Sequence, residues 1–228
     1  ALMLAAQDNT NVEVIQYICD TFEDTIDINQ QNNDRYTALM LAVYNKNDKV
    51  LQYLCNTFKD TIDINKQNKK GDTLLMHALR FNKNEKVIQY LCDTFKDKID
   101  INKCNSYGST ASMFAVQTKD LTIIQYLCDI YKDRIDISKR TDRNGNTAFM
   151  LAVLDHNTYK KSYISLDLIE INKQNKDCQS IETMQYLCDK FKDTIDINKQ
   201  NNDGATVLML AARYNKNDEV MQYLCETF

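Results

Sequence analysis

Cysteine is the most frequent residue in this sequence that could bind a metal or form a covalent link. The chain has eight cysteines, and six of them end a recurring Gln-Tyr-Leu-Cys string or its near copy Gln-Tyr-Ile-Cys. These six are Cys19, Cys55, Cys92, Cys128, Cys188 and Cys225. Packed helices lie about 8–10 Å apart, whereas a disulfide needs Cα atoms within about 7 Å. A ladder of thiols one copy apart is therefore out of bridging range.

The six repeated cysteines are predicted to be buried thiols rather than metal ligands. No Cys-x-x-Cys string and no neighbouring pair of histidines accompanies them. We expect them to pack beside leucines in a reducing compartment. Cys104 and Cys178 fall in turn or insertion regions, where we expect exposure, and no pairing is implied for them. The sequence thus predicts no metal site.

Histidines and aspartates do not form the pattern of an active site. His77 and His156 have no matching nucleophile motif, and the chain's four glycines provide no phosphate-binding loop. Aspartate recurs once per copy in an Ile-Asp-Ile-Asn or Ile-Asp-Ile-Ser string, at Asp63, Asp100, Asp136 and Asp196. A catalytic carboxylate pair would occur once, so we expect these aspartates to bond backbone groups of neighbouring arms. We predict that the protein is not an enzyme and takes no cofactor.

The same strings divide the chain into about six copies of one unit, 36 or 37 residues long. The tyrosine of Gln-Tyr-Leu-Cys stands at positions 17, 53, 90, 126, 186 and 223, and a Thr-x-x-Met string keeps step with it. A period of this length is typical of repeat proteins, in which each unit packs only on its neighbours.

Hydrophobic periodicity within one copy predicts two helices and an extended arm. In the third copy Thr73 is placed to cap a short apolar helix over 74–79. Asn82 is expected to end that helix in a left-handed conformation, and Asn84 to cap a second helix. Apolar residues of the second helix recur at helical spacing from Val87 to Phe95. The Ile-Asp-Ile-Asn string then changes to a period of two, which predicts an extended arm.

All four glycines stand two residues before a repeat threonine, at Gly71, Gly108, Gly145 and Gly204. A residue type confined to one register implies a backbone requirement, here a positive φ angle. The second copy has Arg35 instead. A left-handed arginine costs about 1 kcal/mol, so this turn is either slightly strained or shaped differently.

The unit with these features resembles the ankyrin repeat. Residues 142–153 read Asp-Arg-Asn-Gly-Asn-Thr-Ala-Phe-Met-Leu-Ala-Val, residues 220–225 read Val-Met-Gln-Tyr-Leu-Cys, and residues 62–65 read Ile-Asp-Ile-Asn. These match in turn the tip and first helix, the second helix, and the closing arm of that repeat. The resemblance covers essentially the whole chain and implies an all-α ankyrin-type solenoid with short extended turns or β-hairpin tips.

The chain departs from the usual ankyrin pattern in a consistent way. Methionine replaces the usual histidine at Met40, Met76, Met113, Met150 and Met209. Asparagine replaces the glycine between the helices at Asn45, Asn82 and Asn215. About three extra residues precede the closing arm, and we interpret them as an additional turn of the second helix. That turn is expected to end near Phe22, Phe58, Phe95, Tyr131 and Phe191.

The whole chain, 1–228, is predicted to be a single array. Its expected repeats are 1–29 (partial), 30–65, 66–102, 103–138, 139–198 and 199–228 (partial), with an insertion near 156–178 in the fifth. The insertion is either functional or drift tolerated on a surface. Both outermost copies are incomplete and the first is apolar, so we predict a window of a longer repeat protein.

Composition limits the classes of partner. The net charge is -4, which disfavours nucleic acid, and no apolar run is long enough to span a membrane. Charge is uneven: residues 1–34 carry seven acidic and no basic side chains, whereas residues 66–103 carry nine basic and five acidic. This gradient either selects a partner or is a solvated face. We expect an intracellular, cytoplasmic protein.

The resemblance implies binding of a partner protein on the concave side, through turn tips and the exposed end of each first helix. Residues at these positions differ between copies, and tyrosine and arginine are the usual hot spots of interfaces. The candidate binding residues are Tyr36, Tyr44, Lys69, Lys70, Arg80, Phe81, Tyr107, Arg143, Arg213 and Tyr214. For Tyr44, Phe81 and Tyr214 the alternative is that they only staple neighbouring repeats.

A non-catalytic protein-interaction scaffold is therefore the predicted function. Two alternatives remain open. One is a structural spacer or assembly segment of a larger complex, and the other is the targeting arm of an enzyme or channel whose chemistry lies outside this segment.

Overall fold

The structure is a computed structural model that describes the chain except for residues 10, 45–47, 140–143, 155–178 and 216. The insertion predicted near 156–178 lies outside the described residues. Contacts divide the chain into two compact units, Ala1–Ser106 and Tyr107–Phe228. These are called unit 1 and unit 2, and each is described by itself.

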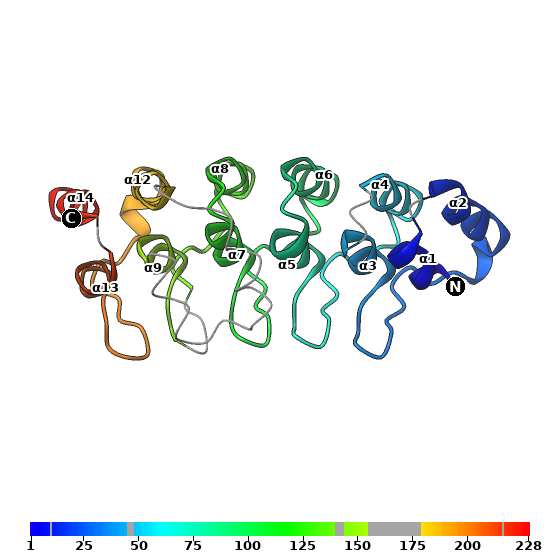
Figure 1. Ribbon diagram of the computed structural model, residues 1–228, viewed down its shortest axis with the longest axis horizontal. Coiled ribbons are helices and arrows are strands. Elements are labelled where there is room, and N and C mark those ends of the chain that lie inside the picture. Colours follow the sequence, from blue (N-terminus) through cyan, green and yellow to red (C-terminus); the bar gives the residue numbers. More distant parts are fainter. Residues whose placement is uncertain (10, 45–47, 140–143, 155–178, 216) are drawn as a thin grey trace. The chain divides into compact units, whose positions relative to one another are not determined.

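Unit 1 is built from helix pairs (Figure 1). Its first helices are α1 (Leu2–Asp8), α3 (Ala38–Tyr44) and α5 (Leu74–His77), and α5 continues into the π-helical turn η2 (Ala78–Asn82). Its second helices are α2 (Val12–Thr21), α4 (Asp48–Thr57) and α6 (Glu85–Phe95), with the 3₁₀ turn η1 (Glu23–Thr25) after α2. Helices α1, α3 and α5 pack side by side in one layer, α2 and α4 in the other.

Unit 2 repeats the same arrangement. Its first helices are α7 (Ala111–Thr118), α9 (Ala148–Val153) and α13 (Val207–Tyr214). Its second helices are α8 (Leu121–Ile130), α12 (Gln179–Phe191), which the 3₁₀ turn η4 (Lys192–Thr194) follows, and α14 (Asp218–Thr227). No strand is present in the described part of the chain, so the predicted all-α fold is confirmed, with hairpin-shaped tips that lack strands.

The repeat threonines cap the first helices as predicted. The Thr73 hydroxyl accepts a hydrogen bond from the backbone N–H of Met76, and the Met76 sulfur accepts one from the N–H of Thr73. Thr147 caps α9 in the same way. Thr110 differs, because its hydroxyl pairs with that of Ser112 at 2.8 Å instead. Asn84 caps α6 through the N–H of Lys86, also as predicted.

The prediction that Asn82 takes a left-handed conformation is wrong. The left-handed residue is the next one, Lys83, with φ of 54°, and Asn215 is extended at φ of -93°. The Asn82 side chain instead accepts a hydrogen bond from the N–H of Asn84. This side-chain turn stabilises the chain between the helices and leaves the left-handed position to the following lysine.

The additional turn of the second helix is confirmed. Helices α2, α4, α6, α8 and α12 end within one residue of the aromatic positions named above. At Phe95 and Tyr131, both 1% exposed, the aromatic side chain closes the helix against the core, whereas Phe22 is 50% exposed.

The arms are tied together by asparagine rather than by aspartate, contrary to expectation. Asp63 and Asp100 each accept a hydrogen bond from the N–H two residues on in their own arm. The link to the neighbouring copy comes from Asn65, whose amide donates to the carbonyl of Lys98 and accepts from the N–H of Asp100. An amide both donates and accepts, whereas a carboxylate only accepts.

Buried thiols line the second helices, with one exception. Of the six repeated cysteines, Cys19, Cys55, Cys92, Cys128 and Cys188 are buried. Cys225 is exposed, so the prediction for it is wrong. It lies on α14, on which no further helix pair packs within this chain. Met209 on α13 is 58% exposed for the same reason, although Met40, Met76, Met113 and Met150 at its register are buried.

The repeat glycines all have positive φ, as predicted, between 65° and 76°. Arg35 has φ of 61°, so its turn keeps the glycine conformation and accepts the strain. A Cβ atom on Gly71 would lie 2.4 Å from the backbone nitrogen of Ser106 in the next tip, whereas one on Gly204 would meet nothing within 4 Å.

Alanine at these two glycines should therefore have unequal effects. We expect Gly204→Ala to lower the free energy of unfolding by about 1 kcal/mol, the cost of a left-handed side chain. Gly71→Ala should cost about 2 kcal/mol, because the next tip must also move. Urea unfolding followed by circular dichroism measures both. Equal losses would show that the contact with Ser106 is not a constraint.

Candidate protein-binding surfaces

The tips of unit 1 are held by backbone and asparagine bonds. Asn68 accepts hydrogen bonds from the N–H groups of Lys70 and Asp72, and its own N–H donates to the carbonyl of Asp72. Each tip is also bonded to the next: the N–H of Lys69 donates to the carbonyl of Asp34 at 3.1 Å, and that of Ser106 to Lys70 at 2.9 Å. The frame therefore does not depend on the exposed side chains at Lys69 or Asp34.

Glutamine side chains continue this ladder along the arms. The Gln31 amide donates to the carbonyl of Gln67, and the Gln67 amide donates to that of Cys104. Each glutamine also donates to its own tip, at Arg35 or Gly71. One side chain thus bonds its own tip and the arm of the next repeat, which sets the spacing of the tips.

Arg80 is not at the binding surface, and its prediction as an exposed residue is wrong. Its guanidinium donates to Asp72 at 2.8 Å, and the two side chains are 3% and 1% exposed. The amide of Asn105 donates to the other oxygen of Asp72 at 2.7 Å. Two charge-assisted bonds satisfy the carboxylate, so Arg80 contributes to packing within unit 1.

The reason becomes clear from the last copy, where Arg213 stands at the same register as Arg80, seven residues after the repeat threonine. Arg213 is exposed, as predicted. Ala205 stands in the place of Asp72 there, and cannot accept a hydrogen bond from a guanidinium. Arg213 thus lacks the aspartate that pairs with Arg80, and it lies on α13, the same helix as the exposed Met209.

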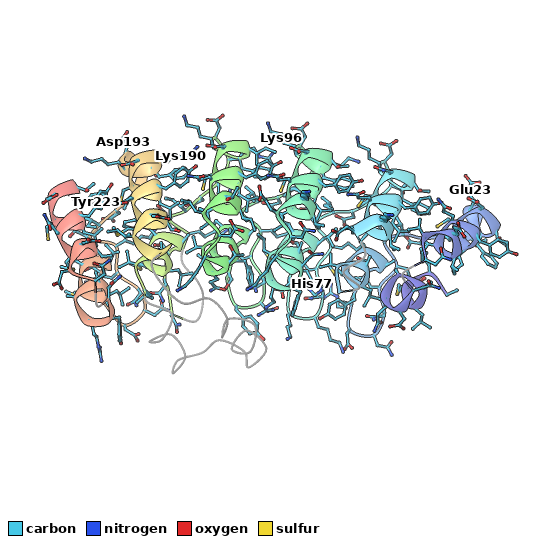
Figure 2. The ribbon with its side chains drawn as sticks, turned by 45° about the horizontal axis from the view of Figure 1, so that its top comes forward. Glu23, His77, Lys96, Lys190, Asp193 and Tyr223 are labelled. Carbon is cyan, nitrogen blue, oxygen red and sulfur yellow. The ribbon has the colours of Figure 1, made fainter. Side chains whose placement is uncertain are left out.

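An aromatic cluster lies beside the tips of unit 1. His77 is fully buried, with its ring 5.4 Å from that of Tyr36 and 4.6 Å from that of Phe81. Tyr36 and Phe81 are half-buried. Burial, with a smaller contribution from the charges of Arg80 and Lys70, lowers the pKa of His77 to about 3. His77 is therefore neutral at pH 7 and part of the core (Figure 2).

Unit 2 has a groove between two tips and α13, with a volume of about 340 Å³. Met209 and Leu210 give it an apolar floor, and Arg213, Tyr214 and Asp203 line it as well. The Arg213 guanidinium stacks 5.0 Å from the Tyr214 ring. Two predicted binding residues therefore meet at one concave site of suitable size for a side chain of a partner.

The remaining candidates are placed as follows. Lys69 is exposed and Lys70 half-buried at a tip of unit 1, and Tyr107 is half-buried at a tip of unit 2. Arg143 and the side chain of Tyr44 lie outside the described residues. Arg35 and Met209 were missed as candidates, although both are exposed on these surfaces. Arg35 could have been identified from the sequence, because it is an arginine at a position where the other copies have glycine.

Two kinds of feature are absent from the described part of the chain. No group of three or more His, Cys, Asp or Glu side chains there could hold a metal ion. No helix among those residues is long and apolar enough to cross a membrane.

Solved structures with the same fold are known. The chain is similar to the ankyrin repeat protein EF0377 with a TM-score of 0.74 and 21% identity, over 99% of this chain and 96% of that one. An ankyrin repeat domain, ABAYE2397, from Acinetobacter baumannii AYE gives 0.69 and 18%, over 99% and 96%. A chain from the complex of the predatory endopeptidase Bd0816 from Bdellovibrio bacteriovorus with the immunity protein Bd3460 gives 0.68 and 20%, over 99% and 97%.

No curated protein matches this chain in sequence. The family model for ankyrin repeats (3 copies), however, matches residues 1–68 and 58–140, which together are more than half of the 228 residues. The helix pairs, the glycine-marked tips and the arms described above have the arrangement that this match implies. The chain belongs to the ankyrin repeat family.

Proposed function

We propose that this protein is a non-catalytic interaction module that binds a partner protein through its tips and the exposed ends of its first helices. The observation that carries the proposal is the contrast between constant core and variable tips. The tips read Asn-Asp-Arg-Tyr at 33–36, Lys-Lys-Gly-Asp at 69–72, Ser-Tyr-Gly-Ser at 106–109 and Asn-Asp-Gly-Ala at 202–205. Backbone bonds maintain the tip frame in spite of these differences.

A variable surface on a fixed frame is what recognition requires, because side chains can change without a change in fold. The groove beside Arg213 and Tyr214 supports the same proposal. Protein binding is also the general role of this fold, and one of the similar structures comes from a complex of an endopeptidase with an immunity protein.

We also propose that the protein is located in an intracellular, reducing compartment. Burial raises the pKa of Cys55, Cys128 and Cys188 to about 12, so that these thiols are protonated and unreactive at neutral pH. Thiols held in this way need no oxidising compartment for stability.

Alanine substitution of the tips tests the proposal. Partners would first be identified by affinity capture with the full chain, then their affinities measured by biolayer interferometry. We expect Tyr36→Ala, Lys69→Ala and Lys70→Ala in unit 1, or Arg213→Ala and Tyr214→Ala in unit 2, to weaken binding at least about tenfold. Lys59→Ala, Lys86→Ala and Lys96→Ala together serve as the control, because these lysines lie on or after second helices. Unchanged affinity in both tip variants would refute the proposal.

A structural spacer is the second candidate, and the bonds between successive copies favour it. In unit 1 the Tyr90 hydroxyl donates to Asn56 at 2.7 Å, and in unit 2 that of Tyr223 donates to Asp189 at 3.1 Å. A spacer would tolerate every tip variant above, yet would lose function when the length of the array is changed. A targeting arm of an enzyme or channel would instead retain partner binding but depend on a domain elsewhere in a longer chain.

A further inference from the structure

The tips of unit 1 carry a basic edge, defined here as Arg35, Lys69 and Lys70. The whole chain has a net charge of -4, and its first 34 residues contain no basic side chain. Two acidic residues, Asp34 and Asp72, lie at the same tips. Asp72 is buried and neutralised by Arg80, so its charge does not offset the basic edge.

Asp34 offsets the basic edge only weakly. It pairs with Lys69 at 3.0 Å, but the two side chains are 66% and 61% exposed. Ion pairs with this exposure contribute little because water and salt screen them. An incoming carboxylate can therefore compete with Asp34 for Lys69.

Arg35 gives an independent indication that this edge has a function. It is held at φ of 61°, the conformation that glycine adopts in the other described tips. The side chain is exposed, so packing does not explain why arginine stands where glycine would fit without strain. Strained residues that stability does not require are concentrated at ligand-binding sites.

The aromatic cluster gives the basic edge an apolar neighbour. Tyr36 directly follows Arg35, and its ring packs on His77 together with the ring of Phe81. Both Tyr36 and Phe81 keep part of their surface accessible. Both rings pack against the fully buried ring of His77. The edge thus combines three cationic side chains with two fixed aromatic rings.

We propose that the basic edge of unit 1 binds an acidic segment of the partner protein. Aspartate or glutamate side chains of that segment pair with Arg35, Lys69 and Lys70, and an apolar or aromatic side chain packs on Tyr36 and Phe81. This inference rests on the proposed function and specifies the chemistry of the partner. A nucleic acid is less suited to this edge, because three cationic side chains neutralise few phosphates, whereas nucleic-acid affinity depends mainly on the number of phosphates neutralised.

The test uses a phage-displayed library of random peptides, panned on the full chain at physiological salt. The affinities of the enriched peptides would then be measured by fluorescence anisotropy. We expect the enriched peptides to contain more aspartate and glutamate than the starting library, and to include aromatic or aliphatic residues. Their affinity should fall at least about tenfold between 50 and 300 mM salt.

Charge reversal with a matched control distinguishes the effect of charges at the basic edge from the effect of the net charge of the protein. Arg35→Glu, Lys69→Glu and Lys70→Glu together should weaken binding of the enriched peptides at least about tenfold. Lys59→Glu, Lys86→Glu and Lys96→Glu make the same change in net charge away from the tips (Lys96 in Figure 2). The affinity of this control variant for the enriched peptides should stay within about threefold of that of the parent. An equal loss in both variants would overturn the inference.

The variant Arg35→Gly provides a test in which a loss of affinity cannot be explained by misfolding. Its melting temperature should be no lower than that of the parent, because glycine relieves the left-handed strain, while the affinity for acidic peptides falls about threefold or more. Unchanged affinity overturns the role of Arg35.

Three further results would also overturn the inference. The first is the enrichment of neutral or basic peptides that the alanine tip variants no longer bind, which leaves the proposed function intact. The second is tighter binding of a random single-stranded oligonucleotide pool that displaces the acidic peptides. The third is the absence of any enriched peptide.

Discussion

Asp72→Ala is expected to lower the free energy of unfolding by about 3–5 kcal/mol, because it leaves the guanidinium of Arg80 buried without its carboxylate. In the parent protein Arg80 is only 4% exposed and cannot turn to solvent without disturbing its neighbours. The amide of Asn105 would lose its acceptor on the same carboxylate. Urea unfolding followed by circular dichroism measures the loss.

A second substitution shows whether the buried charge causes this effect. Asp72→Ala combined with Arg80→Met should regain at least about 2 kcal/mol relative to Asp72→Ala alone, because an apolar side chain needs no ionic partner. Arg213→Met is the matched control: the same residue at the same register is exposed there, so the change should be within about 0.5 kcal/mol. If the double variant were as unstable as Asp72→Ala, lost packing rather than an unpaired charge would be responsible.

Acid is expected to destabilise the protein through His77. The folded pKa is about 3, against 6.5 for the ordinary side chain, so between these values the unfolded state binds a proton that the folded state does not. The contribution of neutral His77 to the free energy of unfolding is therefore fully present above pH 6.5, and it is lost as the pH falls towards 3. At pH 4.5, two units below 6.5, the loss amounts to about 3 kcal/mol.

Comparison with His77→Leu isolates this contribution from that of the carboxylates. Leucine is close in size and cannot bind a proton, so the variant should lose about 3 kcal/mol less than the parent between pH 7.5 and pH 4.5. The free energy of unfolding from urea titrations at both pH values gives the difference. Parallel pH profiles for the two proteins would mean that His77 is protonated without cost, and that its ring is not buried as described.

The class of fold was available from the sequence because its causes are local or periodic. A glycine in one register predicts a left-handed turn without any knowledge of the neighbours, and Gly71, Gly108, Gly145 and Gly204 all have positive φ. Thr73 capping and the length of α6 follow equally from residues within one copy. The division into copies, and the expectation of a single array, remain predictions from these periods.

Local pattern was insufficient at two positions, one bonded to the next copy and one bonded within its own copy. Asp63 and Asn65 stand in one string, but only the packing of successive arms makes Asn65 the link to Lys98. Asn82 was the natural residue for the turn, yet its side chain bonds the N–H of Asn84 and Lys83 takes the left-handed conformation. In both cases the decisive contact involves a backbone group whose position the period does not specify.

The candidate binding surface shows the same division most clearly. The sequence by itself determined the tips and first-helix ends as the variable, outward positions, since they differ between copies while the core does not. Only the tertiary structure decided that Arg80 is buried and Arg213 exposed. The physical reason is that register determines the direction of a side chain, whereas burial depends on what meets it. Asp72, which Asn105 also bonds, pairs with Arg80, and no such aspartate directly precedes the repeat threonine in the copy that contains Arg213.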